Sequence, residues 1–267
     1  MSDEQPTLEL DVTEPESAPR RRLSRGARIA IIVGASLVGV VALLVVADVI
    51  ARGVAEQRLA EEVQANLPET VEGDVDVTIG GFSVIGQYLS GTMEQVTLSA
   101  PELVVEGAPL DVQVSLEGVP VDLAKPVDRL EATITAEQAA LDTLVDIPGA
   151  TGSITLGDAT VGYEGALEFL GRSITFQVTA TPTAAGREVL LQPVGVEIGA
   201  GGGSLDLSGV VDRVLGSDPI PVCVAEHLPE GVEVAAVAAA PGVLRVDLEG
   251  RDVVLDGAAL QQTGSCD

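Results

Sequence analysis

The sequence predicts an α+β protein in which a transmembrane helix precedes an amphipathic helix and a long, curled antiparallel β-sheet. Three observations lead to this fold class. Residues 29–47 carry no charge, residues 48–67 repeat apolar side chains every four positions, and most of the remaining chain alternates apolar and polar residues. These patterns divide the chain into a cytoplasmic tail (1–28), a transmembrane helix (29–47) and an extracytoplasmic domain (48–267).

The tail combines an acidic segment with an arginine cluster. Residues 1–19, MSDEQPTLELDVTEPESAP, contain proline and show no hydrophobic period, so we expect them to be disordered. Five arginines follow, at positions 20, 21, 22, 25 and 28.

Residues 29–47 are predicted to cross the plasma membrane once. A helix of this length spans roughly 28 Å at ~1.5 Å per residue, close to the ~30 Å hydrocarbon core of a bilayer. The arginines precede the run, which keeps the N-terminus in the cytoplasm and sends residues 52–267 outside. Small residues around Ala51 leave signal-peptide cleavage as an alternative, although the long tail and long apolar run favour an uncleaved anchor.

The amphipathic segment continues the anchor into the outer domain. Ala55, Leu59, Val63 and Leu67 recur every four residues between charged side chains, which indicates a helix with one apolar face. Pro68 is expected to end it.

Beyond Pro68 the hydrophobic period changes to two. Alternation predicts antiparallel strands with one dry face at 74–79, 110–117, 130–134, 174–178 and 244–248. We expect short helices at 135–147 and 205–215 and a flexible loop at 199–204, GAGGGS. The predicted helices are too short to cover the dry face. We therefore expect the sheet to curl on itself around either a packed core or an apolar groove.

The composition argues against several functions. From residue 29 onward there are 9 basic and 35 acidic residues, a net charge of 9 − 35 = −26, so the surface repels nucleic acid and adsorbs weakly to anionic lipid. His227 is the single histidine and is expected at the surface beside a turn, so no histidine-based catalytic or zinc site can be assembled. No GxSxG motif occurs, and we expect no enzyme activity, metal or cofactor.

The two cysteines fit an extracytoplasmic location. An even pair in an oxidising compartment indicates a disulfide between Cys223 and Cys266, with two free thiols as the alternative.

A neutral segment, GGFSVIGQYLSG at 80–91, stands out in a chain of net charge −27. We expect it to be a loop at the rim of an apolar cavity, where its side chains contact an acyl chain or the bilayer surface. The alternative is that it plugs the end of an ordinary core. The candidate lipid contacts are the apolar residues of this segment and of the dry strand faces: Phe82, Val84, Ile85, Tyr88, Leu89, Val112, Val114, Leu116 and Phe176.

Four stretches carry a resemblance to a known family: ADVIARGVAEQRLAEEV, GGFSVIGQYLSGTMEQVTLSA, LPEGVEV and GVLRVDLEGRDVVL. Over most of residues 48–260 the chain resembles the actinobacterial LmeA-like phospholipid-binding family. The resemblance implies a fold similar to tubular lipid-binding domains, in which a curled sheet wraps a long helix around an apolar cavity. That family usually has a proline after the phenylalanine of the neutral segment, where this chain has Ser83, which suggests a looser turn.

The resemblance implies phospholipid binding outside the plasma membrane, linked to the maintenance of envelope glycolipids and lipoglycans. No catalytic residue is carried over. The expected partners are a phospholipid or related envelope lipid, the plasma membrane and envelope-biosynthesis enzymes. The alternative is a non-enzymatic envelope scaffold without its own ligand. An anionic head group would need Lys125, Arg129, Arg172 or Arg245 to gather at the cavity mouth.

Overall fold

The computed structural model of the protein describes residues 25–65, 67–68, 70–144, 151–169, 172–200, 203–206, 218–257 and 259–266. The tail predicted to be disordered and three of the five arginines lie outside these residues. Contacts divide the chain into two units, Met1–Ala47 and Asp48–Asp267.

Helix α1, Arg25–Ala65, contains both the charge-free run and the amphipathic repeat. It is long and apolar enough to cross a membrane, with a mean hydropathy of 2.5 in its most apolar stretch, which suits either an anchor or a signal sequence. The helix ends shortly before Pro68, as predicted, because proline disfavours helical backbone in the residue before it. In the second unit, Leu59, Ala60 and Val63 of α1 pack against the hydrophobic core, which confirms the apolar face of the repeat.

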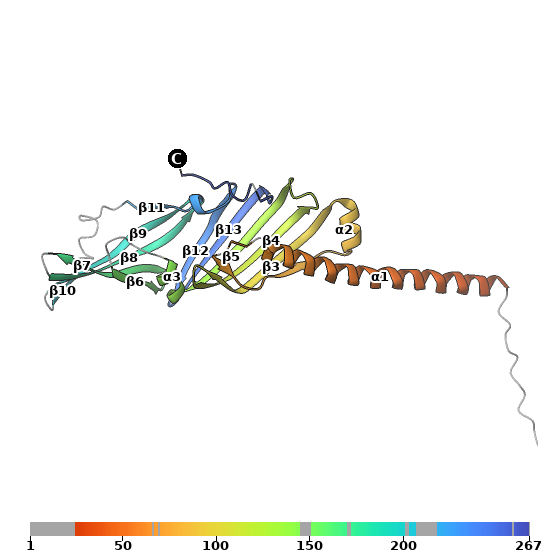
Figure 1. Cartoon of the computed structure of the whole chain (residues 1–267), viewed down its shortest axis with the longest axis horizontal. Coiled ribbons are helices and arrows are strands. Elements are labelled where there is room, and N and C mark those ends of the chain that lie inside the picture. The colour runs from red at the N-terminus through yellow and green to blue at the C-terminus, as the bar shows by residue number, and fades with distance from the viewer. Residues whose placement is uncertain are drawn as a thin grey trace, which may run out of the picture. The chain divides into compact units, whose positions relative to one another are not determined.

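The first sheet is antiparallel and has seven strands. Its order is β1-β3-β4-β5-β13-β12, with β2 paired to β3. Figure 1 labels the five long strands of this sheet, β3, β4, β5, β13 and β12. The strands are β1 (Val71–Glu72), β2 (Asp76–Ile79), β3 (Thr92–Val105), β4 (Ala108–Pro120), β5 (Pro126–Glu137), β12 (Val232–Ala240) and β13 (Val243–Val254). Four of the five predicted alternating segments lie in this sheet, in β2, β4, β5 and β13.

The second sheet is also antiparallel, in the order β10-β9-β8-β7-β6, with β11 paired to β9. Its strands are β6 (Thr151–Gly157), β7 (Thr160–Phe169), β8 (Arg172–Ala185), β9 (Glu188–Ala200), β10 (Gly203–Asp206) and β11 (Ile220–Cys223). The fifth predicted strand lies in β8. Three short helices complete the described fold: α2 (Val84–Ser90), α3 (Gln138–Leu144) and the 3-10 turn η2 (Ala225–His227).

The two sheets meet at β12, the edge strand of the first sheet. The Val234 N–H donates to the Gly186 carbonyl in the β8–β9 turn at 2.8 Å, and the Ala159 N–H in the β6–β7 turn donates to the Ala239 carbonyl at 3.0 Å. The prediction of one long sheet was therefore wrong in this respect, because the strands form two sheets joined along β12. Whether they wrap α1 stays a prediction.

Three local predictions also need correction. Most of the expected glycine loop at 199–204 is strand, because Gly199 and Ser204 pair across β9 and β10. Leu205 pairs with Ile198 in the same ladder, so the expected helix at 205–215 begins as strand, and its remainder lies outside the described residues. The helix expected from residue 135 begins only at Gln138, since β5 extends through Glu137. In each case pairing with a neighbouring strand overrode the local sequence preference.

The core of the second unit lies on the inner face of the first sheet. Val127 is fully buried there, and it clusters with apolar residues of β3, β4, β12 and β13 such as Val96, Leu116, Val234 and Leu248. Inward and outward residues alternate along these strands, as the period of two predicts.

Candidate functional site

An apolar cavity of about 630 Å³ lies between the second sheet and the β5-β13-β12 part of the first, and it is partly open to solvent. Nearly all of its lining side chains are aliphatic. The first sheet contributes Ile134, Val234, Val237, Leu244, Val246 and Leu248. The second contributes Ile154, Leu156, Val161, Val178, Ala180, Pro182, Val189, Leu191 and Val222, and the segments between strands add Leu141, Val224 and Leu228.

Strand alternation explains why this surface is apolar. On β13, Leu244, Val246 and Leu248 line the cavity, while Arg245 and Asp247 between them form an ion pair at 2.8 Å on the opposite face. The same period therefore turns the apolar residues of each strand inward and leaves the charges outside.

Within the part of the chain that the structure describes, two polar side chains line the cavity, those of Tyr163 and His227. The Tyr163 ring lies 5.9 Å from the ring of Phe176, tilted by 35°. Gly165 makes this approach possible, because a Cβ there would lie 2.9 Å from Tyr163 and 3.0 Å from Phe176, too close for either ring. His227 is exposed, as predicted, but it also borders the cavity, which the sequence did not indicate.

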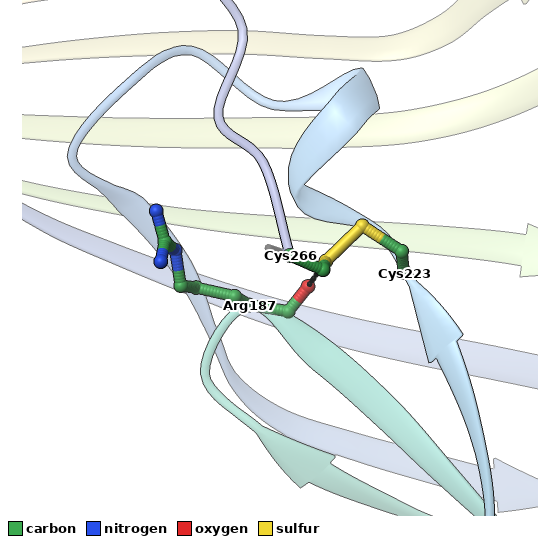
Figure 2. Close-up of a disulfide and its surroundings, with 3 residues drawn as sticks. All are labelled: Arg187, Cys223 and Cys266. Atoms are coloured by element: carbon green, nitrogen blue, oxygen red, sulfur yellow. Dashed lines mark hydrogen bonds between the residues drawn. A yellow bond between two sulfur atoms is a disulfide. The ribbon is translucent and has the colours of Figure 1, made fainter.

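The segment 222–228 forms one wall of the cavity and is fastened to the C-terminal end of the chain. Cys223 and Cys266 form the predicted disulfide, with their Cα atoms 5.9 Å apart (Figure 2). The Arg187 carbonyl oxygen lies 3.3 Å from the Cys266 sulfur and accepts hydrogen bonds from the N–H groups of Val224 and Ala225, each at 3.1 Å. This wall is thus held by one covalent bond and several backbone contacts.

Four of the predicted lipid contacts belong to β4 and β8 but are not among the described residues that line the cavity. Val112 pairs across the ladder with Ile134, which does line it. Val114 and Leu116 continue the same face of β4 into the packed core. Phe176 precedes Val178 on one face of β8 and reaches the cavity through the Tyr163 ring.

The neutral segment is a short helix and not the expected loop. Ser83 caps the N-terminus of α2 by accepting a hydrogen bond from the Gly86 N–H at 3.0 Å, and Gly91 ends the helix with φ of 84°, a conformation that favours glycine. Val84 and Gln87 are buried, with 5% and 6% of their surface exposed. The other apolar residues point away from the domain: Phe82 is 94% exposed, Leu89 is 80% exposed, and Ile85 and Tyr88 are also exposed.

Gln87 attaches α2 to the first sheet. Its amide nitrogen donates to the Gly80 carbonyl at 2.9 Å, and its amide oxygen accepts from the Glu94 N–H at 2.7 Å. Gly81 has φ of 84°, and a Cβ there would lie 2.5 Å from the Gln87 amide nitrogen, so this turn requires glycine.

Three charged residues of α1 hold the same region. Asp48 accepts hydrogen bonds from the Ser83 hydroxyl at 2.7 Å and the Ile85 N–H at 3.0 Å. Arg52 donates to the Gly81 carbonyl at 2.8 Å and also to the Ile79 carbonyl.

Glu56 accepts from the Ile79 N–H at 2.8 Å. The hydrogen bond from the Ser83 hydroxyl, followed by that from Ile85, lowers the pKa of Asp48. The expectation of a looser turn at Ser83 is therefore wrong, because Ser83 both caps α2 and bonds to α1.

No lysine or arginine is among the described residues that line the cavity. Arg129 pairs with Glu131 at 2.8 Å, as Arg245 pairs with Asp247, on the outer face of the sheet. Lys125 is exposed in the β4–β5 loop, and the Arg172 side chain lies outside what the structure describes. Among the described residues, no group of three or more acidic, histidine or cysteine side chains is arranged to hold a metal ion.

Sequence reasoning identified part of the cavity and missed the rest. Alternation in three predicted strands marked Ile134, Val178 and Val246 as dry-face residues, although none was named as a lipid contact. No pattern had indicated the wall formed by β6, β7 and the segment 222–228, because that wall exists only once the second sheet meets β12.

Comparison with known proteins supplies one match. A model described as LmeA-like phospholipid-binding matches residues 46–249, about three quarters of the 267 residues. No curated protein and no solved structure gives a significant match to the chain.

Proposed function

Because the chain belongs to the LmeA-like phospholipid-binding family, we propose that it binds a phospholipid by holding acyl chain in the cavity between the two sheets. The observation that carries this proposal is the aliphatic lining of a cavity of about 630 Å³. Ligand sites of this kind usually measure about 300–1,000 Å³.

The chemistry of the lining suits hydrocarbon. Each methylene group moved from water into such a site contributes about 0.8 kcal/mol, so roughly ten methylenes supply about 8 kcal/mol before the costs of ordering. With Tyr163 and His227 as the polar side chains of the lining, the phospholipid head group remains at the opening. We therefore expect chain length to affect affinity more than head-group type does.

Anchoring and location complete the proposal. Residues 29–47 of α1 act as a single transmembrane anchor, with the N-terminus in the cytoplasm and the domain outside. The arginines before this run and the disulfide of the outer domain support this orientation. The protein serves envelope lipid and lipoglycan maintenance beside envelope-biosynthesis enzymes and catalyses no reaction itself.

Native mass spectrometry of residues 48–267 tests lipid binding directly. The fragment starts at Asp48 because Asp48 and Arg52 bond to the turn before α2. It is secreted from an actinobacterial host and purified without detergent. A bound mass that matches a phospholipid supports the proposal. A protein that stays free of lipid, even after incubation with total envelope lipid, supports instead the scaffold without a ligand.

A further inference from the structure

We propose that α2 is an interfacial anchor whose exposed apolar face inserts into the head-group region of the membrane that residues 29–47 cross. The inference rests on the proposed anchoring, but not on lipid capture in the cavity. It assigns Phe82, Ile85, Tyr88 and Leu89, here called the α2 patch, to the bilayer surface.

The helix is built to present these residues to a partner. Its two buried side chains, Val84 and Gln87, hold it against the first sheet, and its caps, Ser83 and Gly91, fix both ends. Because α2 is packed and capped in this position, the α2 patch stays exposed in the folded protein. An exposed group of large apolar side chains on an otherwise strongly acidic protein marks an interaction site.

The hydrogen bonds of α2 place the patch beside the membrane. Asp48 is the first residue after the charge-free run, and it bonds to Ser83 and Ile85 at 2.7 Å and 3.0 Å. One helical turn later, Arg52 bonds to Gly81. If residues 29–47 span the hydrocarbon, Asp48 lies at its boundary, and α2 is held at the same depth.

A second loop lies at the same end of the first sheet. The Val121 N–H donates to the carbonyl of Gly91, the residue that ends α2, at 3.0 Å. The β4–β5 loop exposes Val121 and Leu123 and carries Lys125, the single lysine of the chain. Apolar side chains and one lysine at this level fit the membrane–water interface, where lysine can extend toward the phosphates.

The composition of the patch favours lipid over a protein partner. Phenylalanine and tyrosine partition well into the interfacial region, and α2 carries no charge that would set the orientation of a protein. A net charge of −27 gives no attraction to anionic lipid, so insertion must depend on apolar contact and not on salt.

Tryptophan fluorescence tests this inference, because the chain contains no tryptophan. The full chain is reconstituted into phosphatidylcholine vesicles with a single Phe82→Trp or Leu89→Trp substitution. Both positions are highly exposed, so folding should not change. The matched control is Val243→Trp, an exposed position at the first residue of β13, at the other end of that strand from the residues that pair beside the β4–β5 loop.

We expect the emission at positions 82 and 89 to shift to shorter wavelength, with at least twofold quenching by lipids brominated near the head group. The tryptophan at position 243 should instead be quenched by aqueous iodide. Neither pattern should change at high salt.

Water-exposed tryptophan at 82 and 89 on protein that floats with the vesicles would overturn the inference and leave the anchoring intact. Protection at these positions only when a second protein is bound would also overturn it, in favour of a protein-docking surface. Failure to float with vesicles would overturn the anchoring and the inference together. Lipid capture by the cavity is read separately, from the mass of the outer domain.

Discussion

Filling the cavity should abolish much of the lipid binding without unfolding the protein. Val178 lines the cavity from β8, pairs across the ladder with Tyr163 and is half-buried. In a Val178→Trp variant, the indole would occupy space that we assign to acyl chain. The site lies beside empty volume, so the larger side chain needs little rearrangement of the two sheets.

The size of the effect follows from the cavity volume that the indole occupies in place of the acyl chain. An indole that displaces roughly three methylene groups removes about 2.4 kcal/mol of binding free energy, at ~0.8 kcal/mol per methylene. At about 1.4 kcal/mol per factor of ten, this corresponds to a roughly 50-fold weaker affinity.

The assay is competition against a fluorescent phospholipid on residues 48–267, with thermal unfolding measured in parallel. The matched control is Val194→Trp, an exposed valine of β9 that does not line the cavity. It should bind lipid normally. If Val178→Trp keeps its melting temperature and binds lipid as tightly as the unchanged protein, the cavity is not the lipid site.

Three further predictions concern the parts that hold the cavity wall and α2. Removing the disulfide with a Cys223→Ala, Cys266→Ala double variant should lower the free energy of unfolding by about 4 kcal/mol, because the bridge closes a loop of 43 residues; urea unfolding with and without reductant measures this. Gln87→Leu removes the hydrogen-bond partner of the Gly80 carbonyl and of the Glu94 N–H, so it should lower the free energy of unfolding by about 2 kcal/mol, measured by thermal unfolding. Unchanged stability would contradict the role of Gln87 in attaching α2 to the first sheet. The lowered pKa of Asp48 means that its bonds to α2 stabilise the fold above its unfolded pKa of about 4 and lose that effect as the pH falls through the lower folded value. The protection of the α2 amides against hydrogen exchange, relative to their intrinsic exchange rates at each pH, should therefore fall at acidic pH, and an Asp48→Ala variant should show low protection already at neutral pH.

The sequence by itself determined the type of α1 and of five of the thirteen described strands. A charge-free run, a repeat of four and a repeat of two are local properties, and they identified α1 and the strands that contain 110–117, 174–178 and 244–248. The disulfide was also predictable, because two cysteines in a domain predicted to be extracytoplasmic have one intramolecular pairing.

The sequence misjudged the neutral segment for a specific physical reason. Its apolar residues were read as a loop at a cavity rim, but what forms α2 is a serine cap, a glycine end and a buried glutamine bonded to the sheet. Serine is a common helix cap, so Ser83 could have indicated the start of α2. The hydrogen bonds of Gln87 and Asp48 follow no periodic spacing in the sequence, so no hydrophobic pattern predicts them.

Only the tertiary structure decided where the cavity lies. Alternation of apolar and polar residues predicts that a strand has one dry face. It does not predict which dry faces meet, because that depends on pairing between strands far apart in the sequence. Here the meeting of the second sheet with β12 brings Val178 and Val246 to one apolar space, while Leu116 belongs to the packed core and Val114 packs against that core. The same aliphatic pattern therefore yields packed interior in one half of the domain and an open site in the other.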